Sequence, residues 1–178
     1  GVDKLAEWSR KLGLGQKTGL KWSAEVAGLI PTPLGREKRT GERWFLGNTY
    51  HLAIGQGDVL ASPVQIARIV SAVVSCRLCD LRVQANTVST CAEVGIKTKT
   101  RELIIEGMKT ACSSGGTAFP FFNFTPPVIC KTGTAQHGGE KTLPHAWITV
   151  IVPKIKEDGE YLSVDYEQGV LITVLLEE

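Results

Sequence analysis

The chain has 178 residues, of which 43% are hydrophobic and 21% charged, a composition typical of a globular domain with a buried core. Its formal net charge of +2 is too small to indicate a nucleic acid or an anionic membrane as the partner. No run of about eighteen apolar residues occurs, which excludes a membrane-spanning helix within the printed sequence. One local cluster of positive charge is interpreted as a solvated loop surface rather than a binding patch; it consists of Arg36, Lys38, Arg39 and Arg43.

The first third of the chain predicts one short helix and a long connector. Apolar residues recur at helical spacing from residue 2 to residue 12, and the "GLG" that follows ends this helix. From residue 17 to residue 48, glycine and proline interrupt the pattern so often that we predict an extended, loop-rich connector. Lys17-Thr18-Gly19 in this connector follows a helix end rather than a strand, so we do not interpret it as a functional motif.

A second helix is predicted from residue 63 to residue 74. Ser62 is a good N-cap, and Pro63 suits the first helical position, where its missing N–H is not needed. The helix is apolar on nearly every side except at Gln65, Arg68 and Ser71, so we expect it to lie inside the domain.

A third helix is predicted within residues 98–112, before "SSGG". Glu102 is expected in its first turn, where a negative charge is favourable. The inner side of this helix is expected to carry Leu103, Met108 and Ala111.

The last third of the chain predicts strands. They are "PPVICKTGTAQ", "HAWITVIVPKI" and "QGVLITVLLEE", separated by the short turns "HGGEKTLP" and "KEDGE". Short turns between consecutive strands imply an antiparallel sheet. We therefore predict a layered α+β fold in which an antiparallel β-sheet is flanked by helices. Within one domain over residues 1–178, residues 1–125 form the helical, loop-rich part and residues 126–178 the sheet part.

Five cysteines raise the possibility of a metal site or of disulfides. Cys76 and Cys79 have the spacing of half a zinc site, but Cys91 and Cys112 stand alone and supply no second pair. We predict no metal, and interpret the cysteines, Cys130 included, as small buried residues with at most one disulfide.

The most unusual segment is "ICKTGTAQHGG", residues 129–139. Its lysine precedes the glycine and lies in a strand, which excludes a phosphate-binding P-loop, and no Gly-x-Gly-x-x-Gly follows a strand elsewhere. Small residues leave the backbone open to a ligand that lies alongside it as an added strand, and the lysine and hydroxyls could then bind a carboxylate. An ordinary strand with a tolerated glycine is the alternative. Side-chain alternation places Lys131, Gly133 and Ala135 on one face and Thr132, Thr134 and Gln136 on the other.

Lys-Thr-Gly on a strand resembles the third signature of the serine penicillin-recognising enzymes. Three further stretches resemble the class B penicillin-binding proteins, which are monofunctional peptidoglycan transpeptidases, in both order and spacing: "GVDKLAEWSRKLGLGQKTGL", "AIGQGDVLASPVQIARIVSAVVS" and "HAWITVIVP". The resemblance covers most of the chain. It implies a penicillin-binding transpeptidase or serine β-lactamase-like fold, and a D,D-transpeptidase that cross-links cell-wall stem peptides through a serine acyl-enzyme, without a cofactor.

The resemblance also implies roles for individual residues. Lys131 would stabilise the anionic end of the substrate, and the hydroxyls of Thr132 and Thr134 would hold its terminal carboxylate beside Gly133. The backbone N–H of Thr134 would be one oxyanion-hole donor. The implied ligands are D-alanyl-D-alanine stem peptides and β-lactams, with no nucleic acid. The parent protein would lie on the extracytoplasmic face of the cell membrane, held there by a segment outside this chain and accompanied by cell-wall synthesis partners.

The chain departs from the family in lacking two signatures. No serine is followed by lysine three residues later or by asparagine two residues later, and Ser163-Val164-Asp165 follows the Lys-Thr-Gly strand instead of preceding it. We therefore expect the chain to begin after the nucleophile, to be incomplete at both ends and to be inactive alone. The rivals are a non-catalytic binding or scaffold relative and a β-lactamase or carboxypeptidase relative.

The histidines offer no alternative catalytic site. A histidine-based triad needs a serine in a turn such as Gly-x-Ser-x-Gly, which does not occur. His137 and His145 flank the turn after the Lys-Thr-Gly strand and are expected to lie near each other as hydrogen-bonded turn residues; His51 is given no role. Trp147, on the next strand, is interpreted as a core residue.

Overall fold

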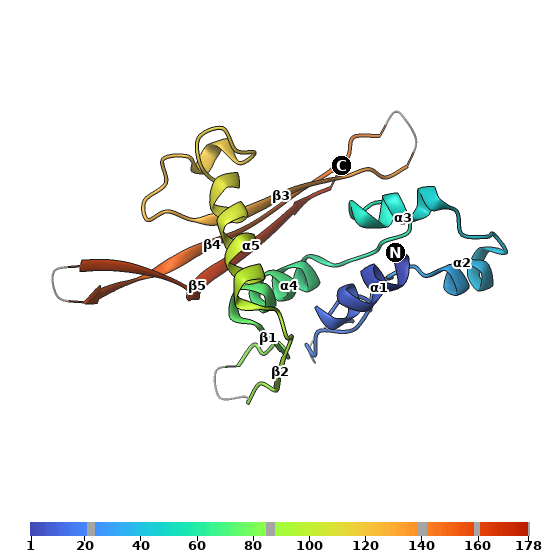
Figure 1. The fold of residues 1–178 in the computed structure, drawn as a ribbon, viewed down its shortest axis with the longest axis horizontal. Coiled ribbons are helices and arrows are strands. Elements are labelled where there is room, and N and C mark those ends of the chain that lie inside the picture. Colours follow the sequence, from blue (N-terminus) through green and yellow to red (C-terminus); the bar gives the residue numbers. More distant parts are fainter. Residues whose placement is uncertain (21–23, 85–87, 139–141, 159–160, 178) are drawn as a thin grey trace. The chain divides into compact units, whose positions relative to one another are not determined.

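The structure is a computed structural model that describes residues 1–20, 24–84, 88–138, 142–158 and 161–177. Its contacts divide the chain into two compact units, one of residues 1–69 and 78–92, the other of residues 70–77 and 93–178. None of the described helices is both long enough and apolar enough to cross a membrane. Figure 1 shows the elements, which in chain order are α1 (Val2–Lys11), α2 (Pro33–Thr40), α3 (Leu46–Ala53), α4 (Pro63–Ser75), β1 (Arg77–Cys79), β2 (Cys91–Glu93), α5 (Thr98–Ala111), the 3-10 helix η1 (Phe119–Phe121), β3 (Ile129–Ala135), β4 (His145–Asp158) and β5 (Tyr161–Leu176).

The buried polar side chains of α4 organise the first unit. Gln65 is 1% exposed, and its amide donates hydrogen bonds to the carbonyl oxygens of Gln16 and Ala27, each at 2.8 Å. Arg68 is also buried and donates to the carbonyl oxygen of Lys17 at 3.3 Å. The prediction that this helix lies inside the domain is confirmed for part of its surface, since Ala72 and Val74 are buried as well, whereas Val64 is 37% exposed. The polar interruptions of the helix bind backbone groups of the connector that would otherwise need water.

The prediction that residues 17–48 form an extended connector was wrong in one respect, because this region contains α2 and the start of α3. The hydroxyl of Thr32 caps α2 by accepting a hydrogen bond from the N–H of Gly35 at 3.1 Å. Pro33 opens the helix, and Gly41, at φ 74°, ends it in the left-handed conformation. No residue of α2 is buried, so the helix lacks the apolar periodicity on which its prediction would depend.

The second unit contains a three-stranded antiparallel sheet in the order β3-β4-β5, and this sheet together with its helices confirms the predicted fold class. In its register Ala135 of β3 pairs with His145 of β4, and Ile129 pairs with Ile151. Ile151 pairs in turn with Leu171 of β5. Helix α5 packs against β3 in this unit (Figure 1).

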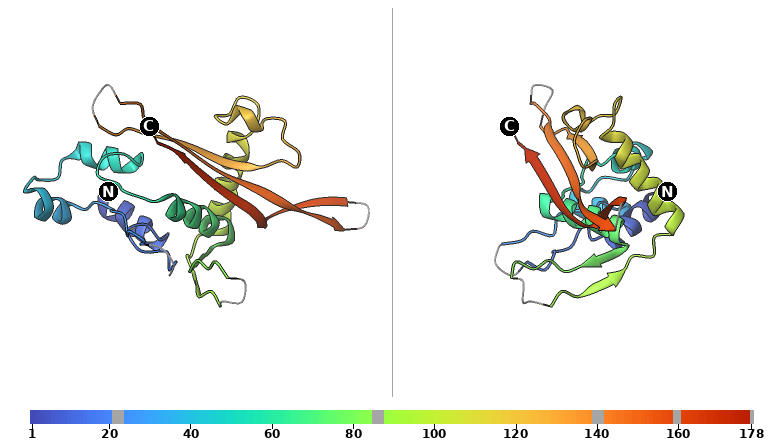
Figure 2. Two further views of the ribbon diagram at one scale, coloured as in Figure 1. Left: turned by 180° about the vertical axis from the view of Figure 1, so that it is seen from behind. Right: turned by 90° about the vertical axis from the view of Figure 1, so that its left-hand side faces the viewer.

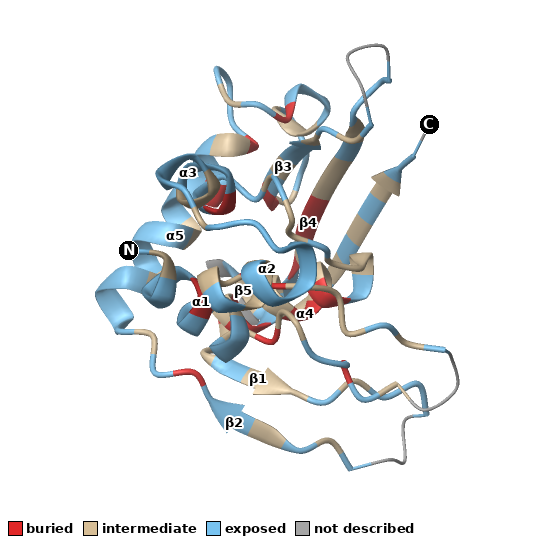
Figure 3. Ribbon diagram, turned by 90° about the vertical axis from the view of Figure 1, so that its right-hand side faces the viewer, coloured by how far each residue is buried: buried red, intermediate tan, exposed pale blue. Residues whose placement is uncertain are grey.

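Two apolar clusters hold the second unit together, one on each face of β3. Because neighbouring residues of a strand point to opposite faces, Ile129 and Cys130 enter different clusters. The first cluster contains Val74, Met108, Ile129 and Ile151, and the second contains Cys112, Ala118, Val128, Cys130 and Val150. Figure 3 shows the buried positions of β4 in the middle of the strand, where the two clusters meet the sheet.

Strands β4 and β5 continue beyond β3 as a two-stranded ribbon (Figure 2). The register shifts between Val152 and Lys154, opposite Gly169, where a Cβ would lie 2.3 Å from the carbonyl oxygen of Val152. This bulge interrupts the alternation of side chains. The sequence pattern therefore placed the start of β5 at Gln168, whereas the strand starts at Tyr161.

The predicted helix at residues 98–112 is confirmed as α5, but two of its details were wrong. Met108 is 7% exposed, as expected, whereas Leu103 is 66% exposed and does not belong to the inner side. Glu102 lies beyond the first turn, which carries no acidic residue. The first turn of α5 contains Arg101, whose guanidinium donates a hydrogen bond to the carbonyl oxygen of Val74 in α4 at 2.5 Å.

The cysteine prediction was also wrong, since the structure contains two disulfides. Pairing of β1 with β2 brings Cys79 to Cys91, with Cα atoms 4.0 Å apart. Packing of α5 against β3 brings Cys112 to Cys130, with Cα atoms 5.9 Å apart. Cys76 has a free thiol. Both juxtapositions come from pairing between elements, which the spacing of cysteines in a sequence does not reveal.

Replacing Cys112 with serine is expected to lower the free energy of unfolding by about 3 kcal/mol, because the disulfide closes an 18-residue loop and restricts the unfolded chain. Urea unfolding of the full-length protein would measure this, with Cys76→Ser as the matched control.

Alkylation of the denatured protein without reductant, followed by peptide mapping, should label Cys76 alone among the five cysteines. Labelling of Cys112 or Cys130 would contradict the assignment.

Candidate functional site

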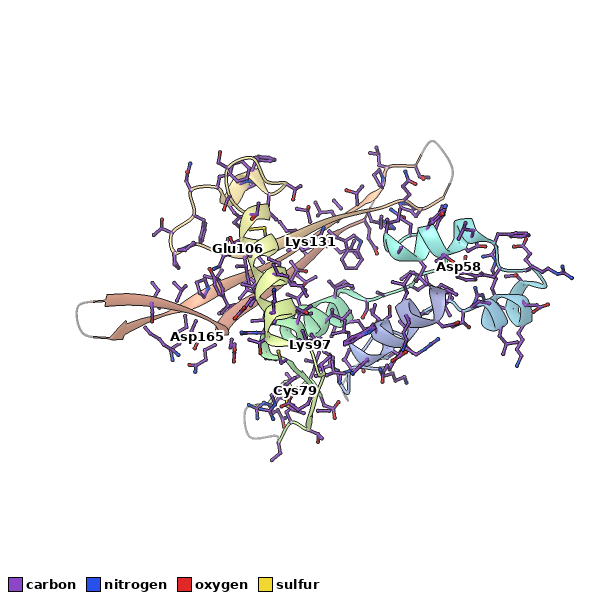
Figure 4. All side chains as sticks on the ribbon, viewed as in Figure 1. Asp58, Cys79, Lys97, Glu106, Lys131 and Asp165 are labelled. Carbon is purple, nitrogen blue, oxygen red and sulfur yellow. A yellow bond between two sulfur atoms is a disulfide. The ribbon has the colours of Figure 1, made fainter. Side chains whose placement is uncertain are left out.

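The four residues singled out by the Lys-Thr-Gly motif lie consecutively on β3, as the strand prediction required: Lys131, Thr132, Gly133 and Thr134. Strand β3 is at one end of the described sheet, and no described strand pairs with its other edge. Lys131, labelled in Figure 4, is exposed, and its ammonium group donates a hydrogen bond to the carbonyl oxygen of Thr132. The strand thus combines an exposed cation with hydroxyl groups.

The hydroxyl of Thr132 has a partner that the sequence did not predict. It donates a hydrogen bond of 2.9 Å to the hydroxyl of Thr117, in the segment between α5 and β3. This segment is joined to β3 a second time, by the Cys112–Cys130 disulfide one residue before Lys131. The candidate strand is therefore tied to the segment that precedes it.

Gly133 has a packing role in addition to any contact with a ligand. It pairs with Trp147 of β4, so both residues point to the same face of the sheet. A Cβ on Gly133 would lie 3.3 Å from the Cβ of Trp147. The glycine, interpreted from sequence as an opening for a ligand, also makes room for this neighbouring tryptophan.

The geometry of β3 suits recognition of an anionic, extended ligand. The outer edge of a sheet offers backbone donors and acceptors that an added peptide strand can use, and β3 is an outer strand among those that the structure describes. Ammonium and hydroxyl groups bind a carboxylate through charge-assisted hydrogen bonds. No serine of this chain lies in a Ser-x-x-Lys sequence, so β3 offers groups that could bind such a ligand without the nucleophile of that signature.

The second Lys-Thr-Gly sequence, at residues 17–19, already holds a carboxylate of the chain itself. The backbone N–H of Thr18 donates to both carboxylate oxygens of Glu25 at 3.1 Å, and that of Gly19 donates at 3.2 Å. The Thr18 hydroxyl, which is fully buried, also donates to Glu25. Residues 17–19 are not in a strand, as the helix end before them predicted.

These bonds predict an acid-sensitive contribution to stability. Burial raises the pKa of Glu25, whereas the hydrogen bonds from Thr18 and Gly19 lower it. The hydrogen bonds together have the larger effect, so the pKa of Glu25 lies below its ordinary value. The stabilisation is then fully present above the unfolded pKa of about 4.3, and is lost as the pH falls through the lower folded pKa. Glu25→Gln should cost about 1–2 kcal/mol at pH 7 and remove this pH dependence.

Urea unfolding between pH 3 and pH 7, in steps of about half a unit, would test the role of Glu25 through its pH-dependent stabilisation. Glu37→Gln, on the exposed surface of α2, is the matched control. Equal loss of stability in both variants, or an unchanged acid profile in Glu25→Gln, would contradict the prediction.

His137 and His145 lie together across the hairpin, as predicted, but the expectation of hydrogen-bonded side chains was wrong for two ring nitrogens: among the described residues, His137 Nε2 and His145 Nδ1 are buried without a hydrogen-bond partner. Their rings are stacked, with centroids 3.7 Å apart and planes at 13°. His145 pairs with Ala135 at the end of β3. His51 belongs to α3 in the first unit. Within the described ranges, no group of three histidine, cysteine or acidic side chains is arranged to bind a metal ion.

Comparison with protein families gives one extensive match. The model of the penicillin binding protein transpeptidase domain matches residues 1–169. Among curated proteins, the peptidoglycan D,D-transpeptidase MrdA of Escherichia coli K12 is 31% identical over 157 residues, covering 79% of this chain and 24% of the relative. MrdA of Acinetobacter baumannii is 39% identical over 67 residues, covering 38% of this chain and 10% of the relative. The chain thus spans about a quarter of the length of the E. coli relative.

Solved structures agree with the family match. The penicillin-binding protein PBP2 of Helicobacter pylori, in complex with MreC, superposes with a TM-score of 0.82 and 28% identity, over 99% of this chain and 32% of that one. PBP2 of Pseudomonas aeruginosa has a TM-score of 0.77 over 99% of this chain and 39% of that one; its 22% identity supports the fold alone. The chain therefore belongs to the penicillin binding protein transpeptidase domain family, as a partial domain of the class B type.

Proposed function

We propose that the full-length protein containing this chain is a serine-type peptidoglycan D,D-transpeptidase that also binds penicillin. The observation that carries the proposal is the Lys131-Thr132-Gly133-Thr134 sequence on β3, an outer strand of the described sheet, in a chain whose family match extends over residues 1–169. The E. coli and A. baumannii relatives are named as peptidoglycan D,D-transpeptidases, which favours this function over a non-catalytic scaffold or a β-lactamase.

In the proposed reaction, a serine outside this chain attacks the carbonyl carbon of the D-alanyl-D-alanine peptide bond. The C–N bond breaks, D-alanine leaves with a proton on its amine, and an acyl-enzyme remains. An amine of a second stem peptide then attacks the ester and returns the proton to the serine. The N–H of Thr134 would stabilise the oxyanion in both steps, and Lys131 with the hydroxyls of Thr132 and Thr134 would hold the substrate carboxylate beside Gly133.

We further propose that the domain works on the extracytoplasmic face of the membrane, to which a segment outside this chain would attach it. The two disulfides support this location, because disulfides persist in oxidising compartments and are rare in the cytosol. The PBP2 of H. pylori has been solved with MreC bound, which supports a cell-wall synthesis partner for the present protein as well.

The decisive experiment treats the full-length protein with a fluorescent penicillin and then with a D-alanyl-D-alanine peptide and an amine acceptor. A covalent adduct of the mass of the penicillin, together with release of D-alanine and formation of the cross-linked product, is expected. Release of D-alanine without cross-linking would instead identify a carboxypeptidase, and rapid hydrolysis of the penicillin a β-lactamase. Absence of any adduct would favour the scaffold alternative.

A further inference from the structure

The segment between α5 and β3 holds Thr117 in a fixed backbone position. Gly116 folds back so closely on the end of α5 that a Cβ would lie 2.3 Å from the carbonyl oxygen of Thr110. Ala118 is 2% exposed, and its N–H donates a hydrogen bond to the carbonyl oxygen of Ala111 at 3.0 Å. Both backbone neighbours of Thr117 are therefore anchored to the last turn of the helix.

The strand that faces Thr117 is anchored as well. Cys130 is fully buried and bonded to Cys112, which is the residue directly after α5. Thr132 lies two residues further along β3, on the same face of the strand as Cys130. The contact of 2.9 Å between the hydroxyls of Thr132 and Thr117 thus joins two positions that the backbone already holds in place.

A threonine hydroxyl has one proton to donate and two lone pairs to accept with. In the structure Thr132 donates its proton to Thr117, so this proton is not available to a ligand. Because hydroxyl protons rotate freely, the direction can reverse when a carboxylate arrives. Thr117 then donates to Thr132, and Thr132 donates to the carboxylate, forming a short chain in which each bond strengthens the next.

We propose that Thr117 is a positioning residue for carboxylate recognition. Its hydroxyl orients that of Thr132 and, when a carboxylate binds, donates a hydrogen bond to it, which strengthens the hydrogen bond that Thr132 donates to the ligand. The enzyme would thereby prefer ligands with a free carboxylate over otherwise identical neutral ones. The inference rests on the proposed function, since it takes Thr132 to be part of the carboxylate-binding strand.

The test compares acylation rates of the full-length protein by a penicillin with a free carboxylate and by its methyl ester. Thr117→Val keeps the shape of the side chain and removes the hydroxyl. It is expected to slow acylation by the free acid about tenfold, the size of a lost charge-assisted hydrogen bond, and to affect the ester much less. Thr117→Ser, which keeps the hydroxyl, should restore the preference for the acid.

Two reference variants separate this inference from the proposed function. Thr110→Val removes a hydroxyl of α5 that donates a hydrogen bond within the helix, to the carbonyl oxygen of Glu106, and controls for general damage. Thr132→Val should weaken the preference for the acid directly. The inference is overturned, while the proposed function stands, if Thr132→Val weakens the preference for the acid and Thr117→Val leaves that preference unchanged. The same conclusion follows if Thr117→Val slows acylation by the acid and by the ester equally. If neither variant changes the preference, the carboxylate role of β3 fails too.

Discussion

Lys131→Ala in the full-length protein is expected to slow acylation by penicillin by about 100- to 1,000-fold, the effect typical of losing one transition-state stabilising group. An ammonium group beside the bound carboxylate stabilises its negative charge through a charge-assisted hydrogen bond. Stability should change little, since Lys131 is exposed and its recorded hydrogen bond is to the carbonyl oxygen of the neighbouring Thr132.

Lys154→Ala is the matched control, because Lys154 is also exposed and also lies on the sheet, where it donates to Gln168 at 3.2 Å. Stopped-flow acylation and thermal melting of both variants would measure the effect. An acylation rate of Lys131→Ala within about threefold of the wild type, far below the loss expected for such a group, would remove Lys131 from the proposed mechanism.

Ile129→Ala is expected to lower the free energy of unfolding by about 2–5 kcal/mol, the cost of lost burial plus a residual cavity. Ile129 is fully buried, and it packs with Val74, Met108 and Ile151 from three other elements. It also lies two residues before Lys131. The same substitution should therefore reduce acylation as well as stability, since displacement of β3 moves the candidate site.

Ile155→Ala removes the same atoms from the ribbon of β4 and β5, where the side chain is 48% exposed, and should cost less than about 1 kcal/mol. Urea unfolding of both variants, followed through the loss of penicillin binding and of tryptophan fluorescence, provides the comparison. Similar losses in the two variants would show that β3 does not lie in the core that stabilises the domain.

Local patterns were sufficient to predict the elements that carry the candidate site. Alternation of side chains and short polar turns predicted β3 and β4 and their antiparallel pairing. The Ser62 cap, Pro63 and a nearly continuous apolar surface predicted α4. The prediction failed where the pattern itself is weak, as in α2, which buries nothing, and at the bulge opposite Gly169, which disrupts alternation.

By itself, the sequence determined the order of the main helices and strands, the family resemblance and the strand that carries Lys131. Helix capping and strand alternation act over a few residues, so a linear pattern records them. Only the tertiary structure decided the contacts around the candidate site: the Cys112–Cys130 disulfide, the packing of Gly133 against Trp147 and the hydroxyl contact of Thr132 with Thr117. Each joins residues at least 14 positions apart, and many alternative partners are equally compatible with the sequence until α5, β3 and β4 pack together.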